Sequence, residues 1–258
     1  MLTTLQYRVL KWVAPDEPTH MSGAVYESKS KLRVLLGDEI VDELRDRVVL
    51  DFGCGDGHEA VSLATEGAAH VVGVDIRPAA LARAEALAAQ RGVGDRCTFV
   101  TEPSEPVDAI VSLDSFEHFG DPAAVLRTMF GMLRPGGRVY TSFGPTWYHP
   151  YGGHLFSVFP WAHLMFSERA LIRWRSDIRS DGATRFSEVE GGLNQMTISR
   201  FEALVRGSPF ELRSLQPVPI RKLRRVHNRF TREFTTAVVR AVLQRPAAPR
   251  SALEPSKP

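Results

Sequence analysis

Cysteine is almost absent from this chain, which has two in 258 residues, Cys54 and Cys97. A single widely spaced pair matches neither a metal-binding pattern nor a disulfide framework. Proteins that depend on disulfides belong to oxidising compartments, so this scarcity favours a reducing one. We therefore expect a cytoplasmic protein.

An excess of charge of one sign is also missing, because 32 Lys and Arg face 30 Asp and Glu, for a net charge of +2. Nucleic-acid binders usually carry a strongly basic balance, so no nucleic-acid partner is expected. No apolar run approaches the roughly 18 residues that a membrane span needs. The N-terminus also lacks the arrangement of a signal peptide. We expect no membrane partner.

What the chain does have is enough apolar content, 43%, to bury a substantial core in one domain. β-Branched segments alternate with helical ones, a pattern that predicts an α/β fold with a doubly wound, Rossmann-like parallel sheet. We expect a helical cap over 1–45, a core over 46–246 with an insertion near 144–195, and a disordered tail over 247–258. The predicted strands include His70–Val74, Cys97–Val100, Val107–Asp114 and Arg138–Phe143; the predicted helices include residues 2–13, Tyr26–Leu44 with a break near Gly37, Pro78–Gln90, the segment after Asp121 and Phe201–Val205.

The most informative stretch is a glycine-rich loop over residues 51–57. The apolar run 48–50 before it predicts a buried parallel strand, and a helical segment follows it. Gly53, Gly55 and Gly57 stand at alternate positions within the loop. Glycine allows sharp turns and lets a ligand approach the main chain closely. The unit therefore predicts a ligand held against the backbone.

The charges around this loop indicate what the ligand carries. Asp75 ends the second predicted strand, where an acidic residue is placed to bind a ribose diol. Dinucleotide binders have a third glycine in G-x-G-x-x-G, but His58 stands there. Asp51 opens the loop instead, and a carboxylate repels a pyrophosphate but attracts an ammonium or sulfonium group. We infer a nucleoside with a cationic substituent.

The sequence D-x-G-x-G-x-G over residues 51–57 resembles motif I of the class I S-adenosylmethionine-dependent methyltransferases, among them the small-molecule enzymes of the type 11 kind. The resemblance covers about residues 23–246. It implies S-adenosylmethionine as cofactor and a seven-stranded sheet whose last two strands, in 209–220 and 233–246, form an antiparallel hairpin. It also implies a set of cofactor-binding residues: Asp51, Gly53, Cys54, Gly55, Gly57, Asp75, Ile76, Glu102 and Asp114.

Residues 114–118, D-S-F-E-H, follow the fourth predicted strand at the edge where open α/β sheets bind ligands. His118 is a candidate base, because its ordinary pKa is near neutrality. In a helical turn, Asp114, Glu117 and His118 would share one face and hold a divalent cation. This spacing resembles the E-x-x-E-H metal site of the ubiquinone-pathway O-methyltransferases, with Asp in place of the first Glu. A third interpretation is that Glu117 and His118 only form hydrogen bonds around the turn.

The insertion after the fifth strand is unusually aromatic. It has the length and position of a lid that excludes water from a substrate. The same composition also fits a dimer contact or a satellite core. We select His154, next to two glycines, as the second candidate catalytic residue. The aromatic residues and histidines of residues 144–166 are Trp147, Tyr148, His149, Tyr151, His154, Phe156, Phe159, Trp161, His163 and Phe166.

Two further segments are open to more than one interpretation. Leu2, Leu5, Val9 and Trp12 have helical spacing, which predicts an amphipathic helix packed on the domain as a flap, with a membrane anchor as the alternative. The residues before the glycine loop often close over the cofactor in the resembled family, so Tyr26 and Arg33 are candidate contacts. A basic run lies between the last two strands and indicates a solvated loop or a site for a phosphate or an acidic carrier protein: Arg221, Lys222, Arg224, Arg225, Arg229 and Arg232.

We therefore expect S-adenosylmethionine-dependent methylation of a small aromatic or apolar secondary metabolite, with O-methylation ahead of N- and C-methylation. A homodimer or a biosynthetic partner protein stays open. The alternative is a subunit or repurposed enzyme of this fold that binds the cofactor or a partner without methyl transfer. A nicotinamide oxidoreductase is disfavoured by Asp51 and His58.

Overall fold

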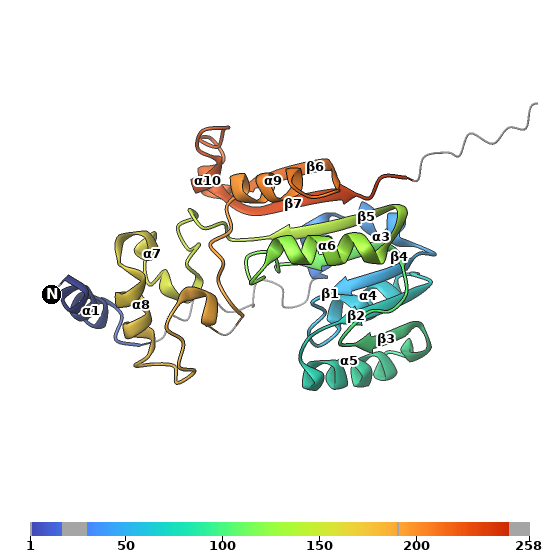
Figure 1. The fold of residues 1–258 in the computed structure, drawn as a ribbon, viewed down its shortest axis with the longest axis horizontal. Helices are drawn as coiled ribbons and strands as arrows, with labels where there is room; N and C mark the ends of the chain where they lie inside the picture. The colour runs from blue at the N-terminus through green and yellow to red at the C-terminus, as the bar shows by residue number, and fades with distance from the viewer. Residues whose placement is uncertain (1, 17–29, 190, 248–258) are drawn as a thin grey trace, which may run out of the picture.

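A computed structural model describes residues 2–16, 30–189 and 191–247 (Figure 1). Its seven strands form one sheet in the order β3-β2-β1-β4-β5-β7-β6. The first five run parallel, and β7 is antiparallel to both β5 and β6. This confirms the predicted sheet and its closing hairpin. The strands are β1 Val48–Phe52, β2 His70–Val74, β3 Cys97–Val100, β4 Val107–Leu113, β5 Leu133–Phe143, β6 Glu211–Pro219 and β7 Thr236–Gln244.

Helices cover both faces of this sheet. Successive side chains along each strand point to opposite faces, so each face packs against its own helices. Val49 joins a cluster with Leu44 on one face, whereas Leu50 joins Leu126 and Phe201 on the other. Three of these helices start at side-chain caps, Ser30, Asp121 and Thr197. The helices around the sheet are α2 Lys31–Leu36, α3 Glu39–Leu44, α4 His58–Thr65, α5 Pro78–Gln90, α6 Pro122–Met132, α9 Ile198–Arg206 and the short α10 Arg232–Thr235, with single 3-10 turns at Gly94–Arg96 and Arg221–Leu223.

The prediction for residues 26–44 is confirmed where the structure describes it. Gly37 separates α2 from α3 with φ of +98°, a value that favours glycine. Tyr26 lies outside the described residues. The Arg33 guanidinium forms ion pairs with Asp38 and Glu66, and its contact with a cofactor stays a prediction.

The fifth strand is longer than predicted. It begins at Leu133 instead of Arg138, because Leu133 already pairs with Val107 before an irregularity in the ladder. Helix α6 therefore ends at Met132, and the Pro135–Gly137 segment lies within the strand instead of forming a separate turn before it.

The insertion folds into a small helical layer together with the N-terminal helix. Its elements are a 3-10 turn at His154–Phe156, α7 Ala162–Met165, α8 Glu168–Arg175 and a 3-10 turn at Phe186–Glu188. Helix α1, Leu2–Val13, packs on α8 rather than on the sheet. Figure 1 shows α1, α7 and α8 together at the opposite end of the molecule from β3 and α5.

The N-terminal helix is confirmed, but its packing differs from the prediction. Leu10 is fully buried in the cluster that α1 shares with Phe156 and Trp174. The predicted stripe, in contrast, faces solvent, with Trp12 85% exposed. Tertiary contacts with α8 therefore selected a different face of this helix from the most apolar one. Within the described ranges, no helix is long and apolar enough to cross a membrane.

Candidate functional site

The glycine loop leaves β1 at the carboxyl edge of the sheet and is held by its neighbour strand. The backbone N–H groups of Gly53 and Cys54 donate to the Val74 carbonyl at 2.8 and 2.9 Å. Gly53 and Gly55 have φ of +83° and +54°. A Cβ added at Gly53 would meet no atom within 4 Å, so it would project into open space above the loop. The loop thus forms a cradle in which a ligand can approach the main chain.

Asp51 lies at the end of β1 beneath this cradle and is 4% exposed. Burial, followed by the nearby charge of Glu59, raises the pKa of Asp51 from 3.8 to about 8. Its Oδ2 atom is buried and has no hydrogen-bond partner among the described residues. A buried carboxyl oxygen without a hydrogen-bond partner is suited to a ligand that brings a positive charge.

Asp75 is also at this edge, but its oxygens already accept hydrogen bonds. Gly55 N–H donates to Oδ2 at 3.0 Å. The backbone N–H and Nε of Arg77 donate to Oδ1 at 2.9 and 3.0 Å, and its terminal nitrogen to Oδ2 at 3.2 Å. Burial alone would raise the pKa of Asp75, but these bonds outweigh it and lower the pKa below its ordinary value. Arg77 thus binds the carboxylate that the sequence analysis assigned to a ribose diol.

The structure places the other predicted cofactor residues in different surroundings. Ile76 is 87% exposed, so its side chain is open to an adenine ring. Glu102 is exposed just after β3, next to β2 in the sheet. Cys54 is buried in the core, and burial raises the pKa of its thiol to about 12. A Cβ at Gly57 would lie 2.6 Å from that of Ala84. Cys54 and Gly57 therefore shape the loop, and neither offers a reactive group.

Asp114 does not lie in the helical turn that the metal prediction required. Its φ is +47°, in the left-handed region, and its N–H donates to the Ser142 carbonyl. Its Oδ2 atom is 3.0 Å from the Nζ atom of Lys31, while Oδ1 is buried and lacks a partner within the described chain. Asp114 therefore pairs with a lysine, and it does not converge with Glu117 and His118 into the predicted three-ligand set.

Glu117 is 2% exposed, and one of its oxygens accepts a hydrogen bond from the Gly144 N–H at 3.0 Å. Burial, followed by the charge of Asp114, raises the pKa of Glu117 to about 8. The other oxygen, Oε2, is buried without a hydrogen-bond partner in the residues that the structure covers. Glu117 is consequently a second buried carboxyl group in which one oxygen has no hydrogen-bond partner in the described part of the chain.

His118 and His154 lie beside each other, with ring centroids 5.2 Å apart. The Nδ1 atom of His118 is 2.8 Å from the Gly192 carbonyl, which can only accept. In the neutral imidazole, Nδ1 therefore carries the proton and Nε2 keeps its lone pair. Burial, followed by the charge of His118, lowers the pKa of His154 to about 4. One ligand atom from each of Glu117, His118 and His154 lies within 4.8 Å of the others.

The two candidate catalytic histidines are thus brought together, which the sequence did not foresee. His154 has φ of +51°, an uncommon value for a non-glycine residue that fixes its direction in the fold. A cavity of about 110 Å³ lies against both imidazoles, with Phe156 and the ion-paired Arg175 also in its wall. The cluster therefore borders a small cavity.

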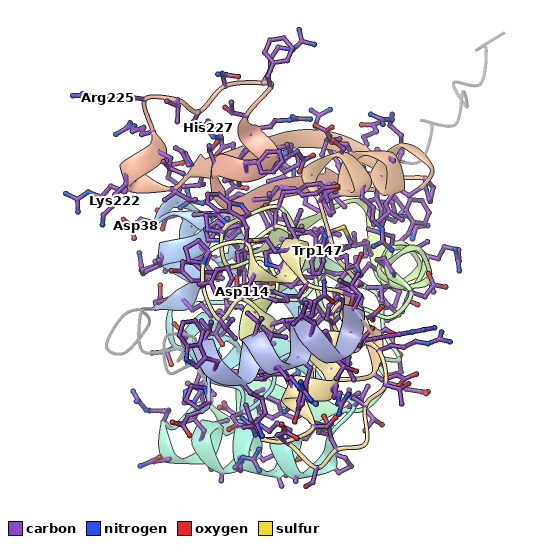
Figure 2. The ribbon with its side chains drawn as sticks, turned by 90° about the vertical axis from the view of Figure 1, so that its left-hand side faces the viewer. Asp38, Asp114, Trp147, Lys222, Arg225 and His227 are labelled. Carbon is purple, nitrogen blue, oxygen red and sulfur yellow. The ribbon has the colours of Figure 1, made fainter. Side chains whose placement is uncertain are left out.

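Part of the insertion is packed as a satellite core, as one of the sequence interpretations allowed. Phe156 and Phe186 are buried in it. His163 is bound between the Ser157 hydroxyl at 2.8 Å and the Trp147 carbonyl at 2.7 Å, so its role is structural. In Figure 2, Trp147 and Asp114 lie within this end of the molecule, with α1 crossing nearer the viewer. A lid function for the insertion stays a prediction.

Comparison with known proteins agrees with this geometry. A family model described as a methyltransferase domain matches residues 26–213. The ubiquinone biosynthesis O-methyltransferase of Pseudomonas fluorescens strain SBW25 is 38% identical over 117 residues, 43% of this chain and 50% of that protein. The homologue of Neisseria meningitidis serogroup C is 36% identical over 107 residues, 39% of this chain and 45% of its own length. The chain thus spans about half the length of the curated relatives it matches.

Among solved structures, an S-adenosylmethionine-dependent methyltransferase from Mesorhizobium loti aligns with a TM-score of 0.55 at 19% identity, over 80% of this chain and 96% of that chain. Such a likeness shows a shared fold. With the family match over most of its length and the cofactor cradle at the sheet edge, the chain belongs to the class I S-adenosylmethionine-dependent methyltransferases.

Proposed function

We propose that this protein transfers the methyl group of S-adenosylmethionine to a hydroxyl oxygen of a small aromatic or apolar metabolite. The observation that carries the proposal is that two clusters of side chains lie at one edge of the sheet, one suited to bind a cation and the other to accept a proton. The cradle with Asp51 and Asp75 offers sites for a cationic nucleoside. The Glu117, His118 and His154 cluster offers lone pairs for a proton.

The cradle residues match the parts of the cofactor. The open backbone around Gly53 and the free Oδ2 atom of Asp51 would hold the charged methionine part. Asp75 would bind the ribose once Arg77 moves aside, and the exposed Ile76 would pack on adenine. When bound, S-adenosylmethionine supplies an electrophilic methyl carbon. The protein then has to position an acceptor, exclude water and take up one proton.

The proton has a defined destination. As the bond from methyl carbon to acceptor oxygen forms and the bond from carbon to sulfur breaks, the hydroxyl proton would pass to the Nε2 atom of His118. That atom is the open side of an imidazole whose orientation is fixed by the Gly192 carbonyl. We expect His154 to orient the acceptor from the insertion, since the burial that lowers its pKa to about 4 keeps the ring neutral.

The predicted cation site is revised by this geometry. The first ligand of the sequence prediction, Asp114, is paired with Lys31, whereas His154 comes close to Glu117 and His118. Two imidazole nitrogens and a carboxylate oxygen are ligands that Zn²⁺ and Mn²⁺ accept. We propose that these three residues can hold a divalent cation. His118 would bind it through Nε2, because Nδ1 is bound to Gly192, so a bound cation would replace the proton transfer to that atom. Calorimetric titration of EDTA-treated protein with ZnCl₂ or MnCl₂ should show binding that His154→Ala removes.

The proposed reaction is tested by incubating the protein with S-adenosylmethionine and a panel of phenols, catechols, amines and carbon acids, and measuring S-adenosylhomocysteine. We expect turnover with hydroxyl acceptors, and a loss of about 10²- to 10⁴-fold in kcat for His118→Ala. Methylation only of amines would overturn the O-methyl assignment. Cofactor binding without turnover on any acceptor class would favour the non-transferring alternative.

A further inference from the structure

Helix α1 presents an apolar stripe to solvent. Leu2, Leu5, Val9 and Trp12 are 70%, 61%, 38% and 85% exposed, although all four lie on one side of the helix. Scattered exposed apolar residues are common on proteins, but a contiguous stripe usually marks an interaction surface. The stripe therefore needs an explanation beyond folding.

This orientation of α1 is fixed by specific contacts on its other side. The Tyr7 hydroxyl donates to Asp177 at 2.8 Å, and Lys11 forms an ion pair with the same carboxylate at 3.0 Å. The Gln6 side chain accepts from the Ser167 hydroxyl at 2.6 Å, while Leu10 is fully buried. Rotating the helix to bury the stripe would break all of these contacts. The stripe is thus held outward by the fold.

A second surface with exposed apolar and basic side chains is the connection between β6 and β7, residues 220–235, which we call the excursion. Its first thirteen residues, 220–232, contain no acidic residue. Apolar side chains stand among the basic ones, with Phe230 82%, Val226 53% and Phe234 45% exposed. The carboxylate of Glu233 is occupied by the N–H groups of Ile198 and Ser199. The exposed basic residues of the excursion are Arg221, Lys222, Arg224, Arg225 and Arg229.

The two surfaces lie towards the same end of the molecule. In Figure 1, α7 lies between α1 and the excursion beside α10, and its Met165 is 65% exposed. Figure 2, viewed from that end, shows α1 across the front and Lys222 and Arg225 projecting at the upper left. The apolar stripe and the basic side chains therefore lie towards the same end of the molecule, while the β3 edge of the sheet lies on the far side.

We propose that this end of the protein binds the surface of an anionic lipid membrane. The α1 stripe would enter the boundary between headgroups and acyl chains, and the excursion would contact acidic headgroups, with Phe230 inserted. Surface helices bind in this way through an apolar face supported by cations, and they need no membrane-spanning segment. The absence of a long apolar run therefore does not oppose this partner.

The charge pattern favours this occupant over a second copy of the chain. Two copies meeting through this end would bring their five-cation excursions together, and like charges repel. An anionic surface instead attracts each of them, and each cation near such a surface strengthens binding about fivefold. Apolar side chains beside the cations gain further by leaving water.

The test uses the full-length protein and two kinds of vesicle, phosphatidylcholine alone and phosphatidylcholine mixed with phosphatidylglycerol. We expect co-flotation with the anionic vesicles only, weakened by added salt. The fluorescence of Trp12, taken as the difference between wild type and Trp12→Phe, should shift to shorter wavelength on binding. No co-flotation, or equal binding to both kinds of vesicle, would overturn the proposal.

Matched variants assign the binding to the two surfaces. Leu5→Ser with Trp12→Ser should abolish insertion, whereas Val34→Ser with Leu212→Ser removes exposed apolar side chains elsewhere and should not. Neutralising Arg221, Lys222, Arg224 and Arg225 to Gln should weaken binding at least about a hundredfold. The control, with the same loss of charge, neutralises the exposed Arg47, Arg91, Arg127 and Arg206.

Sedimentation of the free protein separates membrane binding from self-association. We expect the wild type and the Leu5→Ser, Trp12→Ser variant to sediment alike. A wild-type dimer that this variant dissociates would show that a second copy covers the stripe and would overturn the proposal. Cofactor titration of each variant establishes that it is folded, and because the stripe is remote from the cradle residues, methyl transfer to a water-soluble acceptor should be unchanged.

Discussion

Replacing Asp51 with asparagine should remove most of the pH dependence of cofactor binding. Burial raises the pKa of Asp51 from 3.8 to about 8, so the carboxyl group is mostly protonated at neutral pH before a ligand binds. A cationic cofactor prefers the carboxylate, and its binding must then release this proton. Below the raised pKa, affinity should fall about tenfold for each pH unit. Between about pH 7 and about pH 6, therefore, the Kd for S-adenosylmethionine should rise about tenfold.

Isothermal titration calorimetry at these two pH values measures the effect, and repeating it in buffers of different ionisation enthalpy counts the released proton. S-adenosylhomocysteine, which keeps the ammonium group and lacks the sulfonium, shows which cation Asp51 meets. Glu117→Gln is the matched control, because the pKa of Glu117 is also raised to about 8. A flat wild-type profile, or an unchanged slope in Asp51→Asn, would refute the assignment.

Three other changes test the site and the fold. Arg77→Ser should tighten S-adenosylmethionine binding by up to about fivefold in calorimetry, since the Arg77 side chain is 63% exposed and an ion pair with so exposed a partner stabilises by about 0–1 kcal/mol; weaker binding would show that Arg77 contacts the cofactor. Glu117→Gln should raise Tm increasingly from pH 4.5 to about 8, because a buried carboxyl with a raised pKa loses stability as pH rises through this window; a constant difference would contradict the raised pKa. Gly57→Ala should lower the free energy of unfolding in urea by at least about 1–2 kcal/mol, since its φ is +80° and the new Cβ meets Ala84; an unchanged midpoint would refute this.

The sheet and the cofactor cradle were predictable because their signals are local. The alternation of β-branched runs with helical segments predicts parallel strands, and glycines at alternate positions predict a loop open to a ligand. The prediction that Asp51 and Asp75 lie at the ligand edge follows from their positions at strand ends, because the carboxyl ends of neighbouring parallel strands meet at one edge. Both could be assigned without any knowledge of tertiary packing.

The packing of α1 could not be predicted in this way. Apolar spacing shows that a helix has an apolar face, but it does not show which surface is available to cover it. Contacts with α8 selected Leu10 and Tyr7, and Trp174 Nε1 donates to the Ala14 carbonyl far away in sequence. The same limit applies to Arg77, whose contact with Asp75 depends on a side-chain direction that periodicity does not specify.

The cluster of Glu117, His118 and His154 could not be predicted for a similar reason, because it forms only in the tertiary structure. His118 and His154 lie on separate segments, and only the folding of the insertion against the turn after β4 brings their rings to 5.2 Å. The prediction of Asp114 as a metal ligand assumed a helical turn, but the left-handed backbone at Asp114 turns it towards Lys31. Residue spacing found Glu117 and His118, whereas the third member had to come from the fold.

Buried oxygen atoms mark this site more sharply than the motif does. Asp51, Asp114 and Glu117 each keep one buried carboxyl oxygen without a hydrogen-bond partner in the described structure. A buried polar atom left unsatisfied costs about 1–3 kcal/mol, and more when it is charged. The charge of Lys31 opposes the pKa rise of both Asp51 and Glu117, but it does not prevent it. These oxygens therefore destabilise the fold at one edge of the sheet, and a bound cationic ligand would offset this loss by interacting with them.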